Sequence, residues 1–192
     1  MTSTWEKDGY LLRPAKTEDA ESYFHRNFDP MEGAIAHFTG CKAAFTREEV
    51  LSAFSHWLAD PDRYTFLLVS PDGEIIGESV LNEIDWEAGC ANFRIAIFHQ
   101  GDCSRGLGSW MTEKTLEYAF AALHLHRVEL DVFSFNPRAI RAYEKAGFRR
   151  EGVRREAIPC EGGYADDILM AILEPEWREA HPLFEQNVNG NR

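Results

Sequence analysis

Residues 91–148 constrain the fold of this chain most, because they alternate between strand and helix patterns around a pair of glycines. An apolar segment at residues 92–98 is followed by a polar loop. Gly106 and Gly108 then open an amphipathic segment that runs to Leu123, and a second alternating segment follows at residues 127–134. When a helix connects two strands of one sheet, the strands run parallel to each other, because parallel strands need a crossover connection. The sequence therefore predicts a parallel strand pair with a helix between them.

Gly106 and Gly108 stand where the first strand of this unit ends and its helix begins. The first N–H groups of a helix have no partner inside the helix and attract anions. Glycine lets a phosphate approach the backbone because no Cβ stands in the way. This placement predicts a phosphate-binding loop, although two glycines at this spacing are also common in ordinary loops.

Further strands joined by short turns are predicted on both sides of this unit. They are expected at residues 10–13, 65–70, 75–84, 148–157 and 167–173. Thr17 is expected to cap a helix that runs to Asn27, and Asn136-Pro137 should start a short helix that ends before Gly147.

A capping box of Thr46 and Glu49 should begin another helix that ends before Pro61. The first nine residues and the polar tail at 174–192 carry no predicted element. We expect an α/β fold over 1–192 with its core at residues 11–173, built as a mixed, mostly antiparallel sheet with helices on both faces.

Composition excludes several classes of function. A length of 192 residues with 44% hydrophobic residues suits one domain with a substantial core. The net charge of -12 disfavours nucleic-acid binding and favours cationic partners by electrostatic steering, although solubility alone also explains it. The four cysteines form no CxxC pair, which predicts reduced thiols in the cytoplasm and no metal site. The first residues are polar and lack the basic and apolar regions of a signal peptide, and no membrane span is expected because no apolar run is long enough.

Three blocks of the sequence resemble the GNAT superfamily of N-acetyltransferases, and within it the RimJ/RimL type. The first is Cys103-Ser104-Arg105-Gly106-Leu107-Gly108, beside a family motif of Arg/Gln-x-x-Gly-x-Gly/Ala. The others are residues 125–148, and residues 151–156 with 164–166. Both glycines of the motif match, whereas Cys103 replaces the first basic or amide residue and Arg105 can supply the charge. The resemblance covers residues 11–173.

The resemblance implies a GNAT fold whose sheet is splayed at the central parallel strands, with a bulge in the strand before the loop. It implies direct transfer of an acetyl group from acetyl-CoA to an amine in a ternary complex, without an acetyl-cysteine. The pantetheine arm would pair with the free backbone of the first parallel strand, as an added strand does. The implied contacts to the cofactor are Ile95, Ala96, Ile97, Phe98, Cys103, Ser104, Arg105, Gly106, Leu107, Gly108, Ser109, Asn136, Arg138 and Tyr143.

The resemblance makes Tyr143 the general acid that protonates the leaving thiolate. The pKa values of a thiol and a phenol, about 8.5 and about 10, are close enough for this transfer. Core packing explains Tyr143 equally well, and an N-cap role alone explains Asn136. Glu83 is the candidate general base, although an exposed surface carboxylate is the simpler explanation of that residue.

The acceptor is the least constrained part of the prediction. The RimJ/RimL resemblance points to the α-amino group of a protein or peptide. An α-amino group loses its proton at pH 7 at a cost of about 1 kcal/mol, against about 4.6 kcal/mol for a lysine or polyamine amine. A polyamine or another small amine is the alternative acceptor, and a non-catalytic acyl-CoA-binding module is the alternative of another class. Residues 28–45 are expected to shape the acceptor groove, no nucleic acid or membrane is expected as a partner, and a homodimer is compatible with the sequence.

Overall fold

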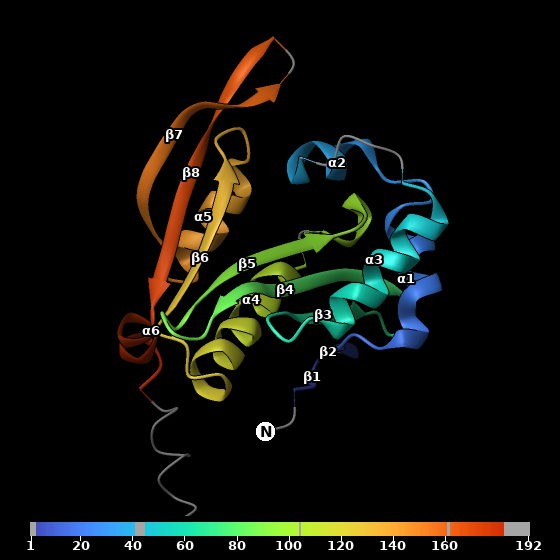
Figure 1. Ribbon diagram of the computed structural model, residues 1–192, viewed down its shortest axis with the longest axis horizontal. Coiled ribbons are helices and arrows are strands. Elements are labelled where there is room, and N and C mark those ends of the chain that lie inside the picture. Colours follow the sequence, from blue (N-terminus) through green and yellow to red (C-terminus); the bar gives the residue numbers. More distant parts are fainter. Residues whose placement is uncertain (1–2, 41–44, 104, 161, 183–192) are drawn as a thin grey trace, which may run out of the picture.

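One eight-stranded sheet forms the centre of the computed structural model, which describes residues 3–40, 45–103, 105–160 and 162–182 (Figure 1). The strand order is β1-β2-β3-β4-β5-β6-β8-β7, and β5 with β6 is the parallel pair. The strands are β1 Trp5–Lys7, β2 Tyr10–Pro14, β3 Tyr64–Val69, β4 Ile75–Asp85, β5 Cys90–Ile97, β6 Arg127–Phe133, β7 Arg149–Cys160 and β8 Gly163–Leu173. The predicted mixed and mostly antiparallel sheet is thereby confirmed.

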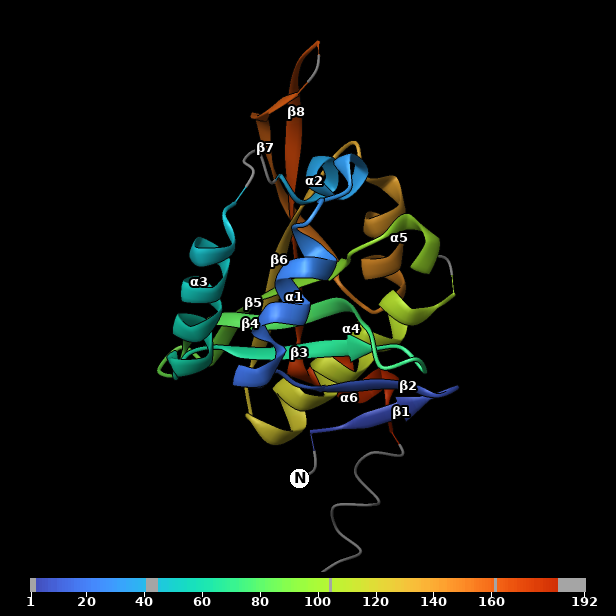
Figure 2. The ribbon, with the colours of Figure 1, turned by 90° about the vertical axis from the view of Figure 1, so that its right-hand side faces the viewer.

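Helices cover both faces of the sheet, as predicted. They are α1 Ala20–Asn27, α2 Gly33–Thr39, α3 Arg47–Ala59, α4 Leu107–Glu117, α5 Pro137–Lys145 and α6 Glu174–Ala180. Figure 2 shows α3 on one side of the sheet and α4 with α5 on the other. A π-helical turn, Tyr118–Ala122, extends α4. In the ranges described, no helix combines the length and apolarity needed to cross a membrane.

The start of α3 follows the predicted capping box. The Glu49 N–H donates to Thr46 Oγ1 at 3.3 Å, and the Thr46 N–H donates to the Glu49 carboxylate at 2.8 Å. Each side chain thus satisfies a backbone donor that the helix leaves free. The helix ends at Ala59, before Pro61 as expected.

The start of α1 differs from the prediction, because Thr17 does not cap it. A single 3-10 turn, Thr17–Asp19, precedes the helix, and the Asp19 carboxylate accepts the Lys16 N–H at 2.8 Å. Arg13 holds the same carboxylate at 2.7 Å, and this hydrogen bond helps keep the pKa of Asp19 below its usual value against the effect of burial. Asp19 is thus the residue at the N-cap of α1, but its carboxylate binds Arg13 and the Lys16 N–H and makes no cap hydrogen bond to the helix.

Two segments predicted to lack regular structure form β1 and α6. β1 pairs with β2 at the edge of the sheet. α6 buries Trp177 to 2% exposure, with its ring 5.5 Å from that of Phe120. One large aromatic side chain thus fixes a helix whose other residues are mostly polar.

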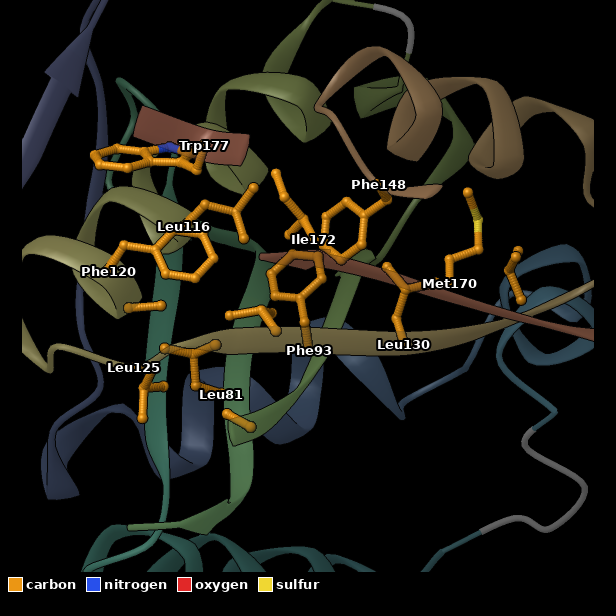
Figure 3. Packing of buried hydrophobic residues seen from close by; sticks show 14 of the residues in the cluster. Leu81, Phe93, Leu116, Phe120, Leu125, Leu130, Phe148, Met170, Ile172 and Trp177 are labelled. Atoms are coloured by element: carbon orange, nitrogen blue, oxygen red, sulfur yellow. The ribbon is translucent and has the colours of Figure 1, made fainter. Parts of the chain in front are cut away.

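The largest hydrophobic cluster lies between the sheet and helices α4, α5 and α6 (Figure 3). Phe93 from β5 and Phe148, which precedes β7, stack with ring centroids 6.1 Å apart. Leu130 from β6 and Met170 from β8 pack in the same cluster. The cluster therefore fixes the positions of β5 and β6 relative to α5.

β5 and β6 separate along their length, as the resemblance implied. They pair only at Cys90–Arg127, Ala91–Val128 and Asn92–Glu129. Beyond Asn92, β5 continues beside β4 while β6 continues beside β8 (Figure 1). We call the opening between β5 and β6 beyond Asn92 the central gap.

The bulge expected in the strand at residues 92–98 lies instead in the neighbouring strand. The pairing of β4 with β5 shifts between Asn82 and Asp85, whereas β5 itself continues in register to Ile97. Glu83 occupies the extra position with a φ of 54°, in the left-handed region. Bulges commonly lie beside active sites, and this one adjoins the closed end of the central gap.

Candidate functional site

The β5 edge of the central gap presents free backbone groups. The Phe98 N–H donates to the Ile76 carbonyl of β4 at 2.9 Å. Because bonded positions alternate along an antiparallel pair, Ala96 also faces β4, while Ile95 and Ile97 turn their N–H and C=O groups toward the gap. Four residues in this segment, 95–98, were predicted to contact the cofactor. Of these, Ile95 and Ile97 have backbone groups that are free to bind a ligand in the gap.

The glycine loop lies where β5 leads into α4. Gly106 is the N-cap of α4, has a φ of 74°, and offers no side chain to the free N–H groups of the helix. A Cβ on Gly108 would meet nothing nearer than Ile97 Cδ1 at 3.9 Å, so packing does not require glycine there. Glycine in a helix costs about 1 kcal/mol relative to alanine. The left-handed φ of Gly106 favours glycine there by itself, whereas neither packing nor helix propensity explains the glycine at 108.

The other residues of this loop differ in what they offer. Arg105 is exposed and donates to Tyr10 Oη at 2.8 Å and to the Gly101 carbonyl at 3.2 Å, which holds its charge beside the loop. Cys103 is half-buried with Sγ 3.6 Å from the His99 carbonyl. The predicted contact Ser104 lies outside the described residues. Leu107 is buried in the core, so only its backbone is available to a ligand, whereas Ser109 is exposed.

Asn136 follows β6 on the other side of the central gap and caps α5. The Ala139 N–H donates to Asn136 Oδ1 at 3.1 Å, which confirms the N-cap role. The amide nitrogen of Asn136 has no hydrogen bond to any residue the structure describes, so it is available to a ligand. Arg138, in the first turn of α5, is exposed.

Tyr143 lies on α5, half-buried against Phe93 of β5 and against Phe148. The ring centroids are 6.4 Å and 5.8 Å from that of Tyr143. Burial raises the pKa of Tyr143 to about 12, so the phenol carries its proton at neutral pH. Within the described chain no group hydrogen-bonds to its hydroxyl. Such a phenol is able to donate a proton to a group that enters from the gap.

Glu83 and Asn82 lie at the closed end of the gap. Asn82 pairs with Asn92, the last β5 residue that pairs with β6. Glu83 is exposed and accepts a hydrogen bond from Asn82 Nδ2 at 3.2 Å. Asn82 Oδ1 is buried and has no hydrogen-bond partner in the described part of the chain. An acceptor oxygen and a carboxylate therefore meet at the point where β5 and β6 part.

A second carboxylate, Glu78 on β4, was missed by the sequence reading. The Tyr23 hydroxyl of α1 donates a hydrogen bond to Glu78 Oε2, with an O···O distance of 3.0 Å. Burial raises the pKa of Glu78, although Tyr23, Arg63 and Arg94 favour its charged form. The signal in the sequence was a glutamate in the first half of the strand at residues 75–84, close after the apolar pair Ile75 and Ile76.

Helix α2 lies across the open end of the gap (Figure 1). At its start Glu32 accepts the Gln100 N–H at 3.0 Å and contacts His99 Nδ1 at 3.1 Å. Toward its end His37 stacks on Phe135, with the ring centroids 4.4 Å apart. The helix thus connects the loop after β5 to the segment after β6.

A free strand edge, an open helix N-terminus and a protonated phenol lie on elements that border the central gap. The edge can pair with amides, the helix N-terminus can bind phosphate, and the phenol can protonate a leaving group. Among the described residues no three His, Cys, Asp or Glu side chains are arranged to hold a metal ion.

Comparisons with known proteins agree with this architecture. A family model described as the acetyltransferase (GNAT) domain matches residues 10–149. The spermidine N(1)-acetyltransferase of Vibrio cholerae is 30% identical over 132 residues, which cover 68% of this chain and 75% of that protein. The Escherichia coli enzyme of the same name is 29% identical over 172 residues, 88% of this chain and 89% of that protein. A solved chimera of the V. cholerae spermidine N-acetyltransferase SpeG and hSSAT superposes with a TM-score of 0.78 at 25% identity, covering 88% of this chain and 98% of that one.

Proposed function

The chain belongs to the GNAT family of acetyltransferases and is an N-acetyltransferase that uses acetyl-CoA, and on this premise we propose that its acceptor is a polyamine of the spermidine type. The observation that carries the proposal is the likeness to two spermidine N(1)-acetyltransferases. The net charge of -12 supports it, since polyamines are cations at neutral pH. The sequence alone favoured an N-terminal amine through the RimJ/RimL resemblance, but these relatives give that type no specific support.

Acetyl-CoA supplies the activated acyl group, and the residues around the central gap suit its binding. The N–H groups of residues 106–109 would bind its phosphates. The gap-facing backbone of Ile95 and Ile97 would pair with the amides of the pantetheine arm. One N–H on this edge would also hold the thioester carbonyl, where it would stabilise negative charge that develops on oxygen.

Tyr143 would act as the general acid and give its proton to the leaving thiolate. Its pKa of about 12 keeps the phenol protonated across the working pH range. The proton passes to a thiolate whose ordinary pKa is about 8.5. Burial of the sulfur in the same gap would raise the pKa of the thiol as well and would bring it closer to the pKa of the phenol.

Glu83 would act as the general base, directly or through a water molecule. A polyamine amine with a pKa of about 10.4 must lose its proton at a cost of about 4.6 kcal/mol at pH 7. The Glu83 carboxylate lies beside Asn82, whose free Oδ1 can accept an N–H from the same amine. Together they would orient the nitrogen lone pair toward the gap.

An acceptor screen by thiol release at pH 7 and pH 9 tests the proposed function. The panels are polyamines, peptides with free or blocked α-amines, and L-amino acids. We expect turnover on spermidine at both pH values, and a higher rate at pH 9 as the amine loses its proton. Turnover on free N-terminal peptides with none on any polyamine would overturn the polyamine assignment and leave the acetyltransferase activity intact.

A further inference from the structure

The β6 edge of the central gap carries an acidic face. Alternate β6 residues, Val128, Leu130 and Val132, are buried in the main cluster, so Asp131 faces the other side of the sheet. Asp131 lies two residues beyond Glu129, the last β6 residue that pairs with β5. At about 3.3 Å per residue it stands about 7 Å along the open part of the gap.

Asp131 shares one guanidinium with Asp167 of β8. Arg154 Nη1 of β7 lies 3.1 Å from a carboxylate oxygen of each. Asp167 is 3% exposed, and its other oxygen, Oδ1, has no hydrogen-bond partner in the described part of the chain. In the described part of the chain two carboxylates thus share one arginine, and they lie close enough for Asp131 to raise the pKa of Asp167. A buried polar atom that lacks a hydrogen bond destabilises the fold, and more so when it is charged.

The electrostatics of Asp167 agree with this shortage of positive charge. Burial and the neighbouring Asp131 raise the pKa of Asp167, and Arg154 only partly opposes them. A further cation at this place would stabilise both carboxylates in their charged form. An ammonium group suits it, because it offers several N–H donors to oxygens that the arginine leaves free.

We propose that Asp131 and Asp167 bind the second, non-reacting ammonium group of the polyamine acceptor. This subsite rests on the polyamine acceptor proposed above. Across the gap, Arg94 of β5 is exposed on the same face of the sheet, because Asn92 and Glu129 pair in register and Arg94 and Asp131 each lie two residues further. Arg94 repels a cation from the β5 side, so the chain of the polyamine is directed toward β6. The reacting amine then lies at the closed end of the gap, beside Asn82 and Glu83.

The test compares Asp131→Asn and Asp167→Asn with Asp72→Asn, which removes the same charge from an exposed turn between β3 and β4. Each is assayed with spermidine and with a primary monoamine of similar chain length. Loss of a charge-assisted hydrogen bond predicts a spermidine KM raised about tenfold or more in the two subsite variants. We expect little change in kcat, in the monoamine KM or in CoA affinity, and calorimetry on the CoA complex should show the same loss of spermidine affinity.

The outcomes separate the subsite from the function on which it rests. If the wild type acetylates spermidine and all three variants share its KM and spermidine affinity, the subsite is refuted while the acceptor assignment stands. If the wild type acetylates no polyamine, both proposals fall. Should Asp167→Asn fail to fold, Asp131→Asn decides alone, because the Asp131 side chain is 42% exposed and Asp167 keeps its ion pair with Arg154 in that variant.

Discussion

Tyr143→Phe removes one oxygen atom from the proposed acid and leaves its surroundings intact. The ring keeps its contacts with Phe93 and Phe148. The variant loses no hydrogen bond to any described residue, so we expect its stability at pH 7 to match that of the wild type. A loss of activity therefore reports on the proton that the phenol donates.

The expected loss follows from the usual worth of general acid catalysis. Removing a positioned acid lowers the rate about 100-fold or more, which is about 2.7 kcal/mol in activation free energy. A pKa of about 12 means that the wild-type phenol stays protonated at pH 7 and at pH 9. The defect of Tyr143→Phe should accordingly be the same at both pH values.

The raised pKa of Tyr143 also predicts how stability depends on pH. Below pH 10, its ordinary value, the phenol is neutral in both folded and unfolded chains and folding is unaffected. Above pH 10 the unfolded chain ionises first, so the wild type loses stability as the pH rises toward about 12. A shift of two units corresponds to about 2.7 kcal/mol when complete and to about 1.4 kcal/mol at pH 11. Tyr143→Phe should lack this part of the loss.

The assay is steady-state thiol release with spermidine, beside calorimetry of CoA binding and urea unfolding at pH 9 and pH 11. We expect kcat to fall, CoA affinity to hold, and the stability difference between variant and wild type to change with pH. Wild-type turnover in a folded Tyr143→Phe would refute the acid role and reduce Tyr143 to a packing residue.

Three further changes test other parts of the site. Gly106→Glu should abolish CoA binding, whereas Gly73→Glu, with a similar φ of 84° in a distant turn, should keep it; calorimetry that finds equal affinities would remove the loop from the cofactor site. Glu83→Gln should lower kcat/KM for spermidine more at pH 7 than at pH 9, because the amine deprotonates unaided as the pH rises, and a pH-independent loss in the rate profile would contradict the base role. Asn136→Asp removes the amide donor but keeps the N-cap, because aspartate caps a helix as well as asparagine does. A thermal melt should therefore show unchanged stability. If calorimetry also finds unchanged CoA affinity, Asn136 serves only as the cap of α5.

The unit around the glycine loop was predictable because its signals are local. Strand and helix periodicity, Gly106 at the start of α4 and Pro137 at the start of α5 each act within a few residues. The capping box of Thr46 and Glu49 is local in the same sense. Before α1 the local rule for N-caps favoured Thr17. The ion pair between Arg13 and Asp19 that forms there instead could not be predicted from the residues next to the helix.

The parts that sequence reasoning missed depend on contacts between distant segments. Tyr23 and Glu78 are 55 residues apart in the chain, and only the packing of α1 on β4 brings them together. Asp131 and Asp167 meet because β6 pairs with β8, a register that no periodicity specifies. The bulge was predicted in the strand that became β5 but lies at Glu83 of β4 for the same reason. Either strand of a pair can contain the extra residue.

Initial-rate kinetics test the direct transfer of the acetyl group within the central gap most directly. Acetyl-CoA and spermidine are varied together, and double-reciprocal plots are compared. We predict intersecting lines, because both substrates must occupy the gap before the acetyl group moves, and no label on the protein after incubation with radiolabelled acetyl-CoA alone. Parallel lines together with a stable acetyl group on a cysteine would show a covalent, two-step transfer and would contradict the mechanism.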